Sequence, residues 1–264
     1  MQRSERIERA LRAYMAEDDS APLLNESMAY SLLDGGKRIR PQLLLLVNDM
    51  LGGSEETALP YACALEMIHC YSLIHDDLPA MDDDVIRRGK PSSHVRFGEG
   101  NAILAGDGLL TKAGLLLLSQ EGHDAAKRAI FEGAYAMVSG QSDDLNLTER
   151  SAEVLERIHL NKTGALFRAA CLAGAYLSDP SGAETMRAFG DTLGLLFQMT
   201  DDLLDEEKDC REHKLTYVTF YGREETKRFV ADAYLRAKTI LAPYTGDAAQ
   251  TLRDLIDQLR SRIY

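Results

Sequence analysis

Two clusters of aspartates are the residues best suited to chemistry in this 264-residue chain. The first lies in residues 71–84, which read YSLIHDDLPAMDDD, and the second in residues 197–205, which read FQMTDDLLD. Carboxylates near the negative C-terminal end of a helix need a cation to offset them. Mg²⁺ binds carboxylate oxygens together with phosphate oxygens of a substrate. We therefore predict that the fold brings both clusters together around several Mg²⁺ ions and a diphosphate.

The spacing within each cluster predicts which carboxylates share a face. Asp201 and Asp205 are one helical turn apart, and Asp202 is offset from them by about 100°. In the first cluster Pro79 disfavours a continuous helix, so Asp76 and Asp77 should end a helix while the chain returns to it on a turn at Asp82. A solvated acidic helix end is the alternative interpretation of either cluster taken singly.

Three separate groups of basic residues support an anionic substrate. GGKRIRP (35–41) has a glycine pair and three cations before the expected start of a helix at Pro41, an arrangement typical of anion sites. Arg87-Arg88 follow the first acidic cluster, and Lys162-Thr163-Gly164 lie within a later helical stretch. Each group alone is commonly a solvated surface group. Their combination with the aspartates favours a substrate that carries a diphosphate.

The elements that must position these residues are helices, because helical periodicity runs through nearly the whole chain and strand patterns are almost absent. An opening amphipathic helix is marked by Ile7, Leu11 and Tyr14, and another starts at Pro41 and ends at Gly52-Gly53. The remaining expected helices cover about residues 59–77, 101–120, 125–140, 152–177, 184–205, 223–241 and 247–263. Several are apolar on most faces, which is typical of helices surrounded by others. We predict a single all-α domain, a bundle of about ten or more helices.

Composition excludes several classes of protein. The formal net charge of −12 disfavours a nucleic-acid binder. No apolar run reaches the ~18 residues that cross a bilayer, and the charged N-terminus lacks the apolar segment of a signal peptide. The four cysteines form no CxxC pair, which favours free thiols in a reducing cytosol. We expect a cytoplasmic protein.

Five motifs occur in one order along the chain: GGKRIRP (35–41), HCYSLIHDDLPAMDDDVIRRGKPSSH (69–94), NKTG (161–164), FQMTDDLLD (197–205) and KLTYVTFYG (214–222). On these motifs the chain resembles the trans-prenyl diphosphate synthases, most closely the bacterial farnesyl diphosphate synthases, from about Leu23 to its C-terminus. The resemblance implies an isoprenoid synthase fold over residues 1–264 with a central active-site cavity, a shortened first helix, and a homodimer. It also implies condensation of isopentenyl diphosphate with an allylic diphosphate, supported by up to three Mg²⁺ ions, with Mn²⁺ as an alternative.

The resemblance also implies roles for individual residues. Asp76, Asp82 and Asp201 would bind Mg²⁺, with Asp77, Asp202 and Asp205 in support. Arg87, Lys162, Thr163 and Gln198 would hold the allylic diphosphate, and Lys37, Arg40, His69 and Arg88 would hold isopentenyl diphosphate. No protein nucleophile is needed, because the isopentenyl double bond attacks an allylic carbocation.

The spacing of Tyr71 bears on product length. Tyr71 lies five residues before Asp76, hence ~7.5 Å further along the helix axis, where an aromatic ring would close a pocket after a short chain. A plain core tyrosine is the alternative. The DDx₄D form with Tyr71 and Ser72 upstream resembles the bacterial farnesyl pattern, which implies a fifteen-carbon product. Geranyl or geranylgeranyl diphosphate synthesis stays open.

One segment departs from the family pattern. The link EEKDCREHK (206–214) is compressed and lacks the Gly-Lys pair whose lysine reaches the allylic diphosphate in the family. We expect Lys214, ahead of Lys208, to replace it. Loss of one such cation would raise the barrier by ~2–4 kcal/mol. A low-activity or regulatory subunit of a heteromeric prenyl synthase is therefore an alternative, and a class I terpene cyclase is a weaker one because this chain keeps both aspartate motifs.

Overall fold

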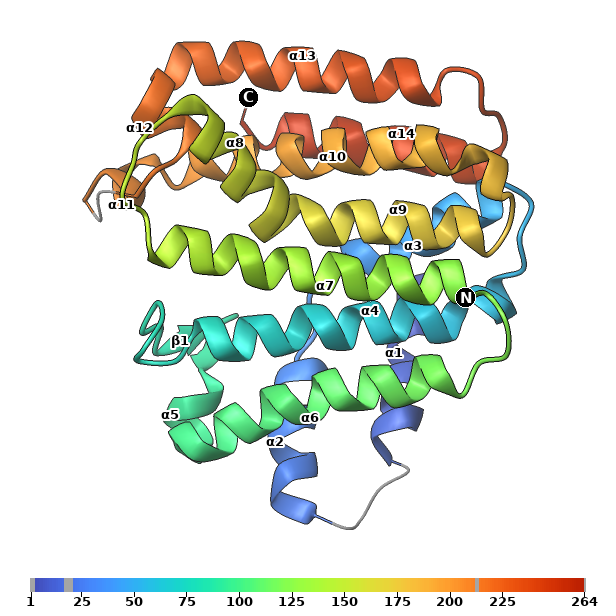
Figure 1. Cartoon of the computed structure of the whole chain (residues 1–264), viewed down its shortest axis with the longest axis vertical. Helices are drawn as coiled ribbons and strands as arrows, with labels where there is room; N and C mark the ends of the chain where they lie inside the picture. Colours follow the sequence, from blue (N-terminus) through green and yellow to red (C-terminus); the bar gives the residue numbers. More distant parts are fainter. Residues whose placement is uncertain (1–2, 17–20, 212–213, 264) are drawn as a thin grey trace.

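The computed structural model describes residues 3–16, 21–211 and 214–263, without the side chains of residues 208–210. The chain forms a bundle of helices joined by short links (Figure 1). In chain order the helices are α1 (Arg3–Ala16), α2 (Pro22–Leu32), α3 (Ile39–Met50), α4 (Glu55–Asp76), α5 (Ser93–Phe97), α6 (Glu99–Leu118), α7 (Asp124–Leu145), α8 (Ala152–His159), α9 (Ala165–Tyr176), α10 (Ala183–Leu204), α11 (Glu206–Arg211), α12 (Tyr217–Tyr221), α13 (Arg223–Leu241) and α14 (Asp247–Ser261).

Short non-α elements interrupt this series. A two-residue hairpin pairs β1 (Ile86–Arg87) with β2 (Lys90–Pro91) directly after the first acidic cluster. A π-helical turn, Leu160–Gly164, joins α8 to α9, and a 3₁₀ turn, Pro180–Gly182, precedes α10. The all-α prediction is confirmed.

The predicted helices are present, with two informative differences. α7 continues to Leu145, five residues past its expected end, and so carries an acidic pair, Asp143 and Asp144. The stretch predicted as one helix over residues 152–177 is broken by the π turn at Leu160–Gly164. α2 and the shorter helices α5, α11 and α12 were not predicted, because such short segments display too few turns for periodicity to be recognised.

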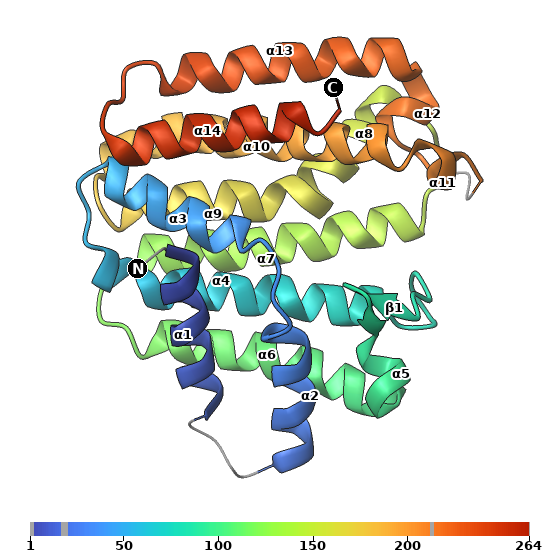
Figure 2. The same cartoon turned by 180° about the vertical axis from the view of Figure 1, so that it is seen from behind.

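The core forms where α4, α9 and α10 pack against their neighbours. α9 is nearly all buried and is rich in alanine, which favours helix and lets other helices approach closely. On α4, Tyr61, Leu65 and Ile68 are fully buried, and the side chain of Ser54 caps its N-terminus by accepting a hydrogen bond from the backbone of Thr57. Seen from behind, α1, α2, α3 and α14 cover the other face of these central helices (Figure 2).

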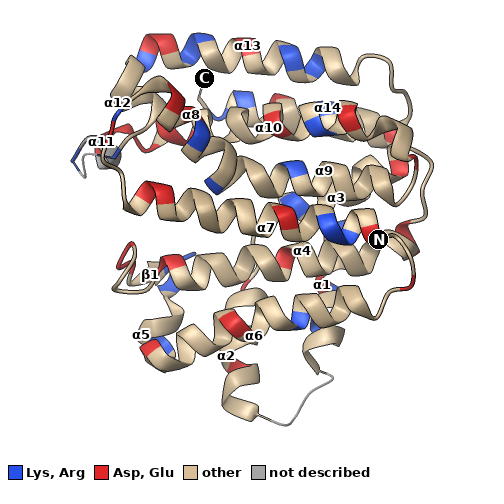
Figure 3. Cartoon of the chain, in the orientation of Figure 1, with Lys and Arg blue, Asp and Glu red and all other residues tan. Residues whose placement is uncertain are grey.

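The chain direction of the central helices positions the acidic residues. α4, α7 and α10 all run toward the end of the bundle that carries β1 and α11 (Figure 1). Acidic residues, coloured red, occur at that end on several helices (Figure 3). Among the described helices, only α6 is long and apolar enough by composition to cross a bilayer, and it packs along α4 as part of the bundle.

Candidate active site

The first acidic cluster folds as Pro79 predicts. α4 ends at Asp76, and the backbone N–H of Asp82 donates to the carbonyl of Asp76 at 2.8 Å, so the chain turns back onto the helix end. Asp76 is half-buried, and burial raises its pKa to about 6, although Lys162 opposes this shift. Its carboxylate is therefore mostly ionised at neutral pH and adjoins a lysine of another helix.

The second residue of the doublet has a different environment. Asp77 is 2% exposed and accepts a 2.9 Å hydrogen bond from Nε of Arg87, with a further contact to Nη2. Burial raises the pKa of Asp77, and Arg87 works against that rise. The carboxylate of Asp77 thus holds Arg87 beside the first acidic cluster.

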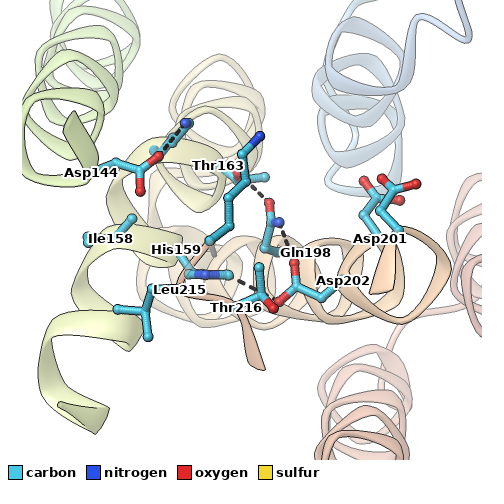
Figure 4. Close-up of a pocket in the computed structure, with 12 residues that line it drawn as sticks. Asp144, Ile158, His159, Thr163, Gln198, Asp201, Asp202, Leu215 and Thr216 are labelled. Carbon is cyan, nitrogen blue, oxygen red and sulfur yellow. Dashed lines mark hydrogen bonds and ion pairs between the residues drawn. The ribbon is translucent and has the colours of Figure 1, made fainter. Parts of the chain in front are cut away.

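The second acidic cluster closes α10 and shows the same division of roles (Figure 4). Asp201 forms an ion pair with Arg262 at 2.8 Å, whereas Asp202 is 2% exposed. Asp202 accepts hydrogen bonds from Nε2 of Gln198 and from the backbone N–H of Tyr217, each at 2.8 Å. Burial raises the pKa of Asp202 to about 6 despite these bonds. Asp202 therefore anchors the segment that starts α12.

The π turn brings cations and hydroxyls between the two clusters. Nζ of Lys162 bonds to a carboxylate oxygen of Asp144 at 2.6 Å, and the hydroxyl of Thr163 donates to Oε1 of Gln198 at 2.7 Å. A Cβ at Gly140 would lie 2.3 Å from the backbone nitrogen of Lys162, so only glycine lets α7 pack against this turn. Such π turns are frequent at functional sites.

Two adjoining cavities meet at Lys162. The polar cavity has a volume of about 160 Å³, and its lining residues include Asp144, Lys162, Gln198, Asp201, Asp202, Asp205 and Lys214. A more apolar one of about 350 Å³ extends between α4 and α7 and is lined by Tyr71, Ser72, Asp76, Met137, Val138, Leu145 and Lys162. Asp76 of the first cluster thus lines the apolar cavity, the second cluster lines the polar cavity, and Lys162 lines both.

A third cavity of about 410 Å³ gathers the remaining basic residues expected at the site. It is lined by Lys37, Arg38, Arg40, Glu66, His69, Arg88 and Phe197. Burial lowers the pKa of Arg40 to about 10 and holds the pKa of His69 well below its ordinary value, so His69 is neutral. Nη1 of Arg40 lies 3.2 Å from Nε2 of His69, and the unprotonated Nε2 accepts a hydrogen bond from it.

Sterics explain why glycine is needed at the start of GGKRIRP. Gly36 has a φ of +109°, and a Cβ there would lie 2.9 Å from Nη2 of Arg88. Nη1 of Arg88 also donates to the carbonyl of Gly35 at 2.8 Å. The tight glycine turn therefore seats Arg88 from the hairpin next to Lys37 and Arg40.

The chemistry of these donors suits a hard divalent cation. Among the described residues, no group of three or more His, Cys, Asp or Glu side chains is close enough to hold a metal ion unaided. The expected ligands Asp76, Asp82 and Asp201 offer only carboxylate oxygens. Mg²⁺ characteristically takes one or two carboxylates and completes its shell with water and substrate phosphate. The residues present therefore fit Mg²⁺ when a diphosphate is bound with it.

Sequence reasoning missed several residues of the site. Asp144 lines the polar cavity and pairs with Lys162, and its signal was an acidic pair after an apolar helical run, as in the two recognised clusters. His159, 5% exposed, lies with Nδ1 4.0 Å from Asp202 and its ring against Tyr217. A single histidine in a helix gives no comparable signal. Glu66, which lines the third cavity and accepts a hydrogen bond from Arg38, was also missed.

The compressed link is only partly described. Lys214 lines the polar cavity with Lys162 and Asp202. The side chain of Lys208, the other candidate, lies outside the described residues. Cys63, Cys70 and Cys171 are buried free thiols, and the side chain of Cys210 is also outside the described part.

Comparison with known proteins agrees with this geometry. The family model for polyprenyl synthetase matches residues 21–234. The farnesyl diphosphate synthase of Bacillus subtilis is 42% identical over 96% of this chain and 95% of its own length. The large subunit 1 of a heterodimeric geranylgeranyl pyrophosphate synthase of Arabidopsis thaliana is 40% identical over 94% of this chain and 76% of its own length. A geranyltransferase structure from Legionella pneumophila superimposes with a TM-score of 0.90 at 36% identity, covering 98% of this chain and 94% of that one.

A helical bundle whose two aspartate motifs and basic residues converge on adjoining cavities is the framework of an isoprenoid synthase. The chain belongs to the polyprenyl synthetase family. It is a prenyltransferase of isoprenoid biosynthesis with an all-α fold.

Proposed function

We propose that this protein makes farnesyl diphosphate by condensing isopentenyl diphosphate with dimethylallyl or geranyl diphosphate. The observation that carries the proposal is the position of Lys162 at the junction of a polar, acidic cavity and an apolar one. An allylic diphosphate has a charged head and an apolar tail, so it fits across this junction. The relatives of this chain at about 40% identity include both farnesyl and geranylgeranyl diphosphate synthases. Geranylgeranyl diphosphate synthesis is therefore the second candidate.

The residues of the polar cavity would bind the allylic diphosphate and stabilise its departure. Lys162 supplies fixed positive charge from this cavity, whereas Arg87 lines a different, smaller cavity and would supply charge from beside Asp77. Fixed charge is the strongest contribution a site can make to a leaving group that gains negative charge. The hydroxyl of Thr163 donates its one hydrogen to Oε1 of Gln198 at 2.7 Å, so Thr163 would turn this hydrogen to a phosphate oxygen when it binds the diphosphate. Lys214 would add a further cation from the α12 side.

Asp76, Asp82 and Asp201 would hold Mg²⁺, with Asp202 and Asp205 in support. When bound with the diphosphate, Mg²⁺ supplies additional neutralisation of the leaving group. Asp76 on α4 lines the apolar cavity, Asp201 on α10 lines the polar one, and Lys162 lines both.

The third cavity would bind isopentenyl diphosphate. Lys37, Arg40 and Arg88 provide charge for its diphosphate, and neutral His69 orients Arg40. The bound double bond would attack the allylic carbocation, and the product cation would then lose a proton. We assign the departed diphosphate as the acceptor of that proton, as the resemblance to the family implies.

We also propose that the enzyme is a cytosolic homodimer. α6 and α7 expose large apolar side chains on their outer faces: Leu104, Leu115, Leu118, Phe131, Tyr135 and Val138. A second copy of this chain, packed on the same face, would cover them. Val138 also lines the apolar cavity, so the partner would adjoin the tail of the substrate.

The decisive experiment measures products of the purified chain with Mg²⁺, labelled isopentenyl diphosphate and each allylic primer in turn. We expect a fifteen-carbon product from dimethylallyl or geranyl diphosphate and no extension of farnesyl diphosphate. A dominant twenty-carbon product would favour the second candidate. Absence of any product would favour a subunit that needs a partner chain.

Two variants test the metal ligands in the same assay. Asp76→Ala and Asp201→Ala should each lower turnover by about 100-fold or more, since charge stabilisation of the leaving group is lost. Their far-ultraviolet circular dichroism should match that of the unchanged protein. Asp232→Ala, an exposed aspartate on α13, is the control and should keep full activity. Full activity of either test variant would refute the assignment.

A further inference from the structure

Arg38 lines the third cavity with the other cations, but its guanidinium is hydrogen-bonded to other groups of the protein. Nη1 donates to Oε1 of Glu66 at 2.8 Å, and Nη2 donates to Oε2 of Glu8 at 2.9 Å and to the carbonyl of Leu32 at 2.6 Å. The Arg38 and Glu66 side chains are each only 3% exposed. The guanidinium thus joins α4, α1 and the end of α2, and its charge is already balanced by two carboxylates.

The backbone of Arg38 is also unusual. Its φ of 49° and ψ of 38° lie in the left-handed region, which residues other than glycine seldom adopt. Such a conformation persists where the surrounding structure holds it, and it is concentrated at functional sites. The three hydrogen bonds of the Arg38 side chain provide that restraint at the residue directly before α3 begins.

The restrained turn determines where the neighbouring cations lie. Lys37 precedes the turn, and Arg40 follows it in the first turn of α3, where it contacts His69. His69 lies three residues after Glu66, and residues at this spacing are neighbours on one face of α4. Arg38–Glu66 and Arg40–His69 are therefore adjacent contacts that tie the start of α3 to a single face of α4.

We propose that Arg38 is a positioning residue for the isopentenyl diphosphate site, with Glu66 as its partner. It binds no substrate; it fixes the left-handed turn so that Lys37, Arg40 and Arg88 converge on one diphosphate. This inference rests on the proposed function, because it assigns the third cavity to isopentenyl diphosphate.

The proposal predicts an effect on one substrate only. Arg38→Met removes all three hydrogen bonds, so the KM for isopentenyl diphosphate should rise about 10- to 100-fold, the loss expected from small displacements of positioned groups. The KM for geranyl diphosphate and the kcat at saturation should stay within about twofold. Arg38→Lys can reach one carboxylate and should restore part of the affinity.

A paired variant separates positioning from folding. Arg38→Met alone leaves Glu66 as a buried unpaired carboxylate, which lowers stability, whereas Arg38→Met with Glu66→Met replaces a buried ion pair by apolar side chains and should restore the Tm. The paired variant should nevertheless keep the raised KM for isopentenyl diphosphate. Arg12→Met is the matched control, because exposed Arg12 bonds to the same Glu8 at 2.8 Å but lies outside the cavity.

The outcomes distinguish this inference from the proposed function. If the unchanged protein does not consume isopentenyl diphosphate, the proposed function itself is wrong. If the unchanged protein is active and the paired variant has a normal KM for isopentenyl diphosphate, Arg38 serves folding alone and the inference is overturned. Equal increases in the KM of both substrates would overturn it as well.

Discussion

Adjacent aspartates in each motif have opposite environments. In the first doublet Asp76 adjoins the cavity, while Asp77 is buried against Arg87. In the second doublet Asp201 is half-exposed, while Asp202 is buried against Gln198 and the backbone of Tyr217. Consecutive helical residues point about 100° apart, so the two carboxylates of a doublet meet different neighbours. Each doublet thus combines a candidate ligand with an anchor.

The buried anchor Asp202 should give stability a distinctive pH dependence. Burial raises its pKa from the ordinary 3.8 to about 6, so the folded state binds more protons than the unfolded state between these values. The free energy of unfolding should therefore fall as pH rises from about 4 to about 6, by up to roughly 3 kcal/mol from this group, and stay level above that range. Urea unfolding without metal, compared with Asp202→Asn, measures this contribution. Identical pH profiles for the two proteins would contradict it.

Tyr71 is the residue expected to limit product length. Its side chain is 6% exposed and lines the apolar cavity, with its ring 5.8 Å from that of His75. Tyr71→Ala should deepen the cavity and shift the main product from fifteen to twenty or more carbons, as read by chromatography of the hydrolysed products. Cys70→Ala is the control, because Cys70 faces a different, smaller cavity on the other side of α4. An unchanged product distribution in Tyr71→Ala would rule out this role.

At the scale of elements, two departures from regular helix shape the site. The π turn at Leu160–Gly164 brings Lys162 and Thr163 to the cavity wall instead of continuing the register of α8. The segment before α12 is fixed by the bond from the backbone of Tyr217 to Asp202 and by the capping box of Thr216 and Thr219. These local structures present Lys162 and Lys214 to the same cavity.

Lys214 should replace the lysine that the compressed link lacks. Lys214→Ala removes a cation from the diphosphate site, so kcat/KM for the allylic substrate should fall about 30- to 1000-fold, which corresponds to ~2–4 kcal/mol of barrier. Steady-state kinetics with geranyl diphosphate measure the loss. Lys227→Ala, on α13 and paired with Glu224, is the control and should behave as the unchanged protein. Normal turnover of Lys214→Ala would show that another group supplies the charge.

At the scale of the whole molecule, the outer faces of α6 and α7 expose large apolar side chains. Leu115 and Leu118 on α6 and Tyr135 on α7 have exposed fractions of 63%, 76% and 76%. Large exposed apolar patches on a bundle mark interaction surfaces. Of these two helices, α7 lines the apolar cavity, through Met137, Val138 and Leu145. Association over this face would therefore also shield the substrate tail from water.

A charge on this face should therefore prevent association. We expect the protein to be a dimer by light scattering after size exclusion, and Leu115→Asp to be a monomer, since a buried unpaired carboxylate is strongly unfavourable at an interface. Leu235→Asp places the same change at an equally exposed leucine (60%) on α13 and should stay dimeric. A monomeric unchanged protein, or a dimeric Leu115→Asp, would refute the proposed surface.

The sequence alone determined the helical class and most helix positions, and it named most of the candidate residues of the site. These properties depend on local rules: apolar spacing marks a buried helix face, and proline and glycine end or turn the chain. The turn that returns Asp82 to Asp76 followed from Pro79 in the same way. Motif order was also visible, because it needs no knowledge of spatial contacts.

Only the tertiary structure decided which side chains meet. Asp144 pairs with Lys162, and Arg38 with Glu66, across separations that local periodicity does not encode. The different roles of Asp76 and Asp77 likewise depend on which neighbour buries each carboxylate. Burial and pairing arise from the order and direction in which α4, α7, α9 and α10 pack. Those depend on the summed packing of the whole bundle and not on any one stretch of residues.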